Sequence, residues 1–70
     1  MSTRDMPDQI GDLPRIGRPA TSALINAGVT TLADVAALGK RRLLATHGVG
    51  PKAVRILDEA MRERGITFAD

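Results

Sequence analysis

The chain has 70 residues, no cysteine, one histidine and a single aromatic residue, Phe68, with ten Lys and Arg residues against eight Asp and Glu residues. This length corresponds to one small domain near the lower limit for independent folding, and the composition excludes disulfides and a structural zinc site. A net charge of +2 is weak evidence for a nucleic-acid partner, and one aromatic ring argues against single-strand binding by base stacking.

The first nine residues are polar and include Pro7. They predict a loose arm, residues 1–9, ahead of a single domain, residues 10–70, with a short helical turn around residues 8–12. No secretory signal follows Met1, and no run approaches the ~20 apolar residues of a membrane span. We therefore expect a cytoplasmic protein that does not contact a membrane.

Residues 13–17 are predicted to form a first hairpin turn, and a helix is predicted from Pro19 onward. Its inward face is marked by apolar residues at positions i, i+3, i+4 and i+7. These residues are Ala20, Ala23, Leu24 and Ala27. Gly28 follows in the position where a left-handed helix cap is commonest, so the helix is expected to end there.

Two short helices are predicted next. Thr31 and Asp34 have the spacing of a capping box, which predicts a helix that ends at Gly39. Its apolar residues are Leu32, Val35, Ala36 and Leu38. Residues 40–45 predict another short helix, with Leu43 and Leu44 expected to face the core.

Residues 46–50 predict a second hairpin, and Pro51 stands where proline is favoured, at the first position of a helix. This last helix is the clearest element, with Asp58 and Arg62 forming a favourable i, i+4 pair on its outer face. Its apolar stripe consists of Ala53, Val54, Leu57, Ala60 and Met61. Gly65 is expected to end it, and Ile66 and Phe68 to fold back onto the core. No window alternates as a strand does, so the prediction is an all-α bundle of about five short helices.

The two hairpins are related by an internal repeat. Placing Gly50 on Gly17 gives an offset of 33 residues, and the same offset matches further positions. These pairs are Val49 with Ile16, Ala53 with Ala20, Leu57 with Leu24 and Ala60 with Ala27. The chain thus reads as two copies of a glycine turn that leads into a helix.

Such a turn suits anion binding, because a helix start presents unpaired N–H groups and a glycine lets a phosphate approach them closely. Arg18 and Lys52 fall in the first helical turns, where the helix dipole disfavours a positive charge by roughly 0.3–1 kcal/mol. A bound phosphate would reverse that penalty, and Arg15 and Arg55 would widen the basic surface. The candidate DNA-binding residues are Arg15, Gly17, Arg18, Gly48, Gly50, Lys52, Ala53 and Arg55.

Other functional motifs fit less well. Residues 48–53 match a dinucleotide-binding pattern with alanine for the third glycine, but no strand precedes them, and the spacing of a phosphate-binding P-loop is absent. His47 stands alone. The run Lys40-Arg41-Arg42 is more typical of a solvated helix start than of a second phosphate contact, which is the alternative for this run. We predict no catalytic residue, no metal site and no cofactor.

Two glycine turns between helices resemble the tandem helix-hairpin-helix family of DNA repair and recombination proteins, over Leu13 to about Arg64. This resemblance implies a SAM-like architecture and hairpin amides that grip duplex phosphates without reading sequence. The stretches that look most like the C-terminal domain of the bacterial RNA polymerase alpha subunit are residues 27–34, 43–52 and 64–68. In that family the positions of Gly50 and Lys52 contact the DNA backbone. Its principal DNA-binding arginine and an asparagine align with Pro19 and Ser22 here.

The expected partner is therefore duplex DNA, bound without strong sequence preference. The chain is expected to act as a dimer or beside a larger DNA-bound protein. The rival interpretation is a small protein-docking module, which the modest charge and the many alanines also suit. Salt separates the two, because phosphate binding weakens steeply as salt rises and apolar docking does not.

Overall fold

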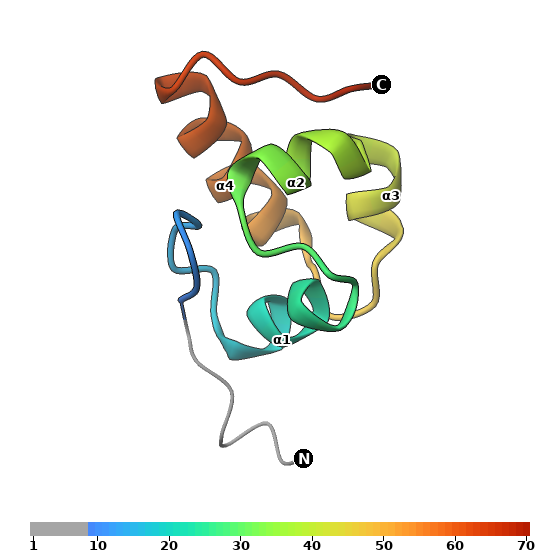
Figure 1. The fold of residues 1–70 in the computed structure, drawn as a ribbon. Helices are drawn as coiled ribbons and strands as arrows, with labels where there is room; N and C mark the ends of the chain where they lie inside the picture. The colour runs from blue at the N-terminus through green and yellow to red at the C-terminus, as the bar shows by residue number, and fades with distance from the viewer. Residues whose placement is uncertain (1–8) are drawn as a thin grey trace.

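Four helices and no strand form the part of the chain that the computed structural model describes, residues 9–70 (Figure 1). They are α1 (Arg18–Asn26), α2 (Leu32–Leu38), α3 (Lys40–Ala45) and α4 (Pro51–Glu63). The all-α prediction is confirmed, with four helices where about five were expected. None of these four helices is long and apolar enough to cross a membrane.

The segment before α1 is not helical where it is described. Residues 9–12 include a turn that the Leu13 N–H closes by donating to the Ile10 carbonyl at 3.0 Å, in place of the expected turn of helix. The expected N-terminal arm, residues 1–9, lies outside the described residues except for Gln9.

α1 ends as its sequence predicts, with Gly28 at a φ of 77°. The Val29 N–H donates back to the Leu24 carbonyl at 2.8 Å, which satisfies a carbonyl of the last turn. Ala27 is exposed, so its expected place on the buried face is wrong. The reason is that the helix stops at Asn26, one residue before the stripe would be complete.

α2 and α3 have the predicted bounds, but Leu44 does not face the core. Leu43 is fully buried, whereas the Leu44 residue is 51% exposed. Successive side chains of a helix point about 100° apart. Because only one face of the short helix α3 lies against the core, Leu43 is buried and the adjacent Leu44 points toward solvent. The expectation that both leucines face inward is wrong for Leu44.

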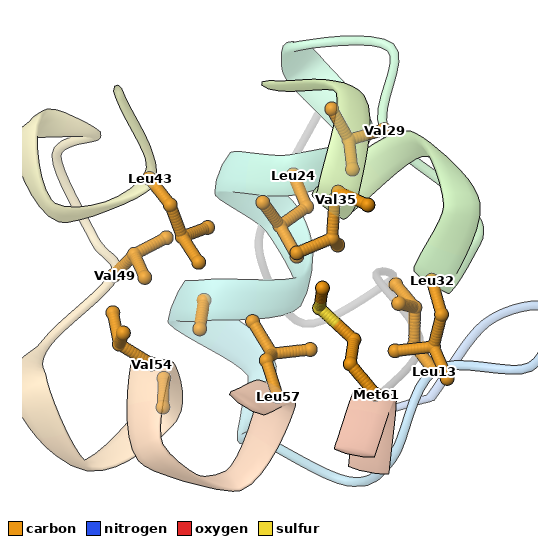
Figure 2. Packing of buried hydrophobic residues seen from close by; sticks show 13 residues of the cluster. Leu13, Leu24, Val29, Leu32, Val35, Leu43, Val49, Val54, Leu57 and Met61 are labelled. Carbon is orange, nitrogen blue, oxygen red and sulfur yellow. The ribbon is translucent and has the colours of Figure 1, made fainter. Parts of the chain in front are cut away.

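The core lies where α4 packs against α2 and α3, with α1 closing one end. Figure 2 shows Leu57 and Met61 of α4 pointing toward Leu24 of α1 and Val35 of α2. The predicted stripe of α4 is confirmed, with Ala60 half-buried at its edge. After Gly65, Ile66 and Phe68 pack against this core as expected, and the Ala69 N–H donates to the Ala36 carbonyl of α2 at 2.9 Å.

Candidate nucleic-acid interface

The helices that follow the two predicted hairpins, α1 and α4, begin in the same way. Gly17 and Gly50 are their N-cap residues, and neither helix start donates a hydrogen bond to an N-cap side chain. Each helix has a proline in its first two positions and no acidic residue in its first turn. Both starts therefore present backbone N–H groups and the positive end of the helix dipole, and no carboxylate within residues 9–70 is seen to accept from them.

The start of α2 is satisfied by three side chains. The Thr31 hydroxyl accepts a hydrogen bond from the Asp34 N–H at 3.1 Å, as the predicted capping box requires. The Asp34 carboxylate reaches back to the Thr30 N–H at 3.2 Å. The Leu32 N–H donates to the Asp12 carboxylate at 2.8 Å, a contact that spans twenty residues of sequence.

The start of α3 is satisfied from even farther along the chain. The Lys40 and Arg41 N–H groups donate to the two carboxylate oxygens of Asp70 at 2.8 and 3.0 Å. These bonds, that of Arg41 first, hold the pKa of Asp70 below its ordinary value of 3.8. The amides of Lys40 and Arg41 are thus already engaged by an anionic group of the protein.

Among the four described helices, a clear division follows. α2 and α3 have carboxylates bound at their starts, whereas no described carboxylate binds the starts of α1 and α4. A glycine N-cap and first-turn cations do not mark this difference, because α3 also begins at Gly39 with Lys40 and Arg41. The sequence pattern indicated α1 and α4, but the capping roles of Asp12 and Asp70 were not predicted. Their partners lie 20 to 30 residues away, and no local spacing connects such distant positions.

The second hairpin packs directly on the start of α1, and the segment between α3 and α4 passes beside that helix in Figure 1. A Cβ atom placed on Gly48 would lie 3.1 Å from the Pro19 carbonyl oxygen and 3.2 Å from the Ala23 Cβ. Since consecutive Cα atoms are about 3.8 Å apart, Gly17 and Gly50 lie within about 22 Å of each other. The contact of Gly48 with α1 therefore links the regions of the two uncapped helix starts.

The internal repeat is reproduced in the core more closely than in the turns. Ala20 and Ala53 are both buried, and Leu24 and Leu57 are both fully buried. The two N-cap glycines differ, because Gly17 has a φ of 91°, whereas Gly50 has extended backbone with a φ of −91°. The two helices of the repeat thus bury matching residues in the core, although the backbone conformations of the preceding turns differ.

Charge is strongly segregated along the chain. Residues 13–57 contain seven of the ten basic residues and one acidic residue, Asp34, which is engaged at the start of α2. Within residues 9–70 the ion pairs are Arg62 with Asp58 at 3.4 Å, as predicted, and Arg64 with Asp12 at 3.2 Å. None of these four residues is a candidate DNA-binding residue. The modest net charge therefore conceals a basic central segment flanked by acidic ends.

The predicted site residues fall into two groups. Arg15, Gly17 and Arg18 surround the start of α1, and the others surround the start of α4. All are exposed except Ala53, whose side chain lies in the core, so that its backbone N–H is the group left to contact a ligand. The side chains of Lys40, Arg41 and Arg42 are exposed at α3.

Between Gln9 and Asp70, no three His, Asp or Glu side chains gather closely enough to hold a metal ion. Comparisons with protein-family models, with curated proteins and with solved structures give no match to this chain.

Proposed function

We propose that the chain is a tandem helix-hairpin-helix domain that binds duplex DNA through its backbone phosphates, without strong sequence preference. In this proposal the N–H groups that follow Gly17 and Gly50 grip two phosphates. Arg15 and Arg18 reinforce the first grip, and Lys52 and Arg55 the second. The likeness in sequence to the polymerase alpha-subunit domain belongs to the same proposal.

The observation that carries the proposal is the contact of the second hairpin with α1, which keeps two uncapped, basic helix starts within about 22 Å of each other. Gly48 lies against α1 within two residues of Gly50, and its contact Pro19 lies within two residues of Gly17. Each strand of a duplex carries one phosphate per about 3.4 Å of helix axis, so starts within about 22 Å of each other can contact one short stretch of DNA.

The charge distribution supports the same conclusion. Residues 13–57 offer their cations to solvent with a single, engaged carboxylate among them. Phosphate contacts of this kind position a protein on DNA but carry no sequence information. Because the cations are few, we expect a dissociation constant of roughly 10⁻⁴–10⁻⁶ M at physiological salt.

The proposal is tested by fluorescence anisotropy of a labelled random-sequence duplex at several salt concentrations. Lys52→Glu is expected to lower the affinity about tenfold or more, since a charge-assisted contact is lost. It is also expected to reduce the slope of log K against log salt by about 1. Arg62→Glu, on the same helix, makes the same change of charge outside the interface and is the matched control.

Equal losses for Lys52→Glu and Arg62→Glu would contradict a localised phosphate grip and would indicate a response to net charge alone. Absence of binding at low salt, from a protein with a cooperative unfolding transition, would contradict DNA binding altogether. The docking-module interpretation would then be preferred.

A further inference from the structure

An open pocket of ≈ 280 Å³ lies between α1 and the second hairpin, beside both proposed phosphate grips. One face of α1, at positions i, i+3, i+4 and i+7, forms its first wall, and the tip of the hairpin forms the second. The lining residues are Pro19, Ser22, Ala23, Asn26, His47 and Gly48. Neither the phosphate contacts nor the core explains why this face of α1 stays open.

The chemistry of the lining favours a flat heterocycle with polar edges. Pro19 and Ala23 supply apolar surface, whereas Ser22, Asn26 and His47 supply donors and acceptors. An Asn side chain forms bidentate bonds with a base such as adenine, and a His ring can stack on a base. A volume just below the range of about 300–1,000 Å³ for ligand pockets suits a single ring better than a larger ligand.

The position of the pocket restricts the source of this ring. Arg18 precedes Pro19 directly, and Lys52 follows Gly48 after three residues, so phosphates on the two grips would flank the opening. A base attached to the backbone between those phosphates could reach the pocket. A base that is already unpaired enters such a pocket at a lower cost than a paired one, because no pairing is lost.

We propose that this pocket receives one unpaired base of the bound DNA, so that the protein prefers a duplex with an unpaired nucleotide to a fully paired duplex. This inference rests on the proposed DNA-binding function. A docked protein side chain is the competing occupant, and it predicts no preference between the two duplexes.

The test compares three labelled duplexes of one sequence by anisotropy at one salt concentration. One is fully paired, one carries a single bulged nucleotide, and one carries an abasic site in the same bulge. The base-bearing bulge is expected to bind at least about fivefold more tightly than the paired duplex, the lower range for stacking a base on a side chain. The abasic bulge is expected to bind like the paired duplex.

Two variants locate the preference in the protein. Asn26 and His47 are exposed, so replacing both by alanine should leave the fold intact, which circular dichroism checks. The Asn26→Ala/His47→Ala variant is expected to reduce the ratio of the two affinities toward 1. Thr67→Ala, on the C-terminal segment, is expected to keep the ratio of the unmodified protein.

Equal binding of the paired and bulged duplexes would overturn this inference and leave phosphate binding intact. Tight binding of the abasic bulge would also overturn it, since the preference would then come from a flexible DNA backbone. An unchanged ratio in the double variant would exclude this pocket. Failure to bind any of the three duplexes would overturn the proposed function and the inference together.

Discussion

Gly48 is the residue at which the two halves of the proposed interface touch. Its φ of 96° is unfavourable for any residue with a side chain, and a methyl group would press on the Pro19 carbonyl and on Ala23. Gly50, two residues later, has ordinary extended backbone and open space where a Cβ would stand. Backbone conformation and close contacts therefore require glycine at position 48, whereas neither requires it at position 50.

We expect Gly48→Ala to destabilise the fold by about 1–3 kcal/mol, the range for strained backbone. Gly50→Ala should change stability by less than about 0.5 kcal/mol, because a poorer N-cap residue offsets the smaller entropy of the unfolded chain. Urea denaturation followed by circular dichroism measures both. Equal losses would show that the contact of Gly48 with α1 does not support the fold.

At the scale of the elements, the carboxylate caps make stability depend on pH. The pKa values of Asp70 and Asp34 lie below the ordinary 3.8 because backbone N–H groups donate to both carboxylates, chiefly those of Arg41 and Thr30 respectively. A carboxyl whose pKa is lower in the folded than in the unfolded state stabilises the fold above the unfolded value. That contribution is lost as the pH falls below 3.8 through the folded-state pKa.

Asp70→Asn should therefore lower the thermal midpoint at about pH 7 and should reduce the loss of stability between about pH 5 and pH 2. The amide offers one acceptor oxygen, where the carboxylate accepts from both Lys40 and Arg41. Scanning calorimetry across this pH range measures the effect, with the exposed Glu59→Gln as the control. The same pH profile for Asp70→Asn and the unmodified protein would contradict the capping role.

Local patterns predicted the helices better than they predicted the contacts between segments. The glycine stops, the Thr31 cap and Pro51 act within one turn, so the bounds of α2 and α3 and the start of α4 follow from them. The exposure of Leu44 depends on how α3 lies on the core, which periodicity over six residues cannot define.

The sequence indicated individual candidate residues but not how they lie relative to one another. The internal repeat indicated Gly17 and Gly50. The positive charges in the first helical turns, where the helix dipole disfavours them, indicated Arg18 and Lys52. The sequence contained no signal for the approach of Gly48 to Pro19 and Ala23, because that contact joins segments about 25 to 30 residues apart. The pocket beside the hairpin exists through the same contact and was equally beyond prediction.

At the scale of the whole molecule, the fold separates two kinds of helix start. Those of α2 and α3 are closed by carboxylates that also fasten the turn before α1 and the C-terminal segment. Those of α1 and α4 are linked by the contact of Gly48 with α1 and have cations and no carboxylate in their first turns. The protein thus uses its own anions at two helix starts and, in our account, DNA phosphates at the other two.

The most direct test of this account is a titration of the ¹⁵N-labelled protein with a short random-sequence duplex, followed by amide chemical shifts at low salt. We expect the largest shifts at the N–H groups of Arg18, Ala20, Lys52 and Ala53, and their reversal as salt is added. The amides of Lys40 and Arg41, already bound to Asp70, should move little. Shifts centred on α2 or α3, or an unchanged spectrum, would contradict phosphate capture at the two hairpins.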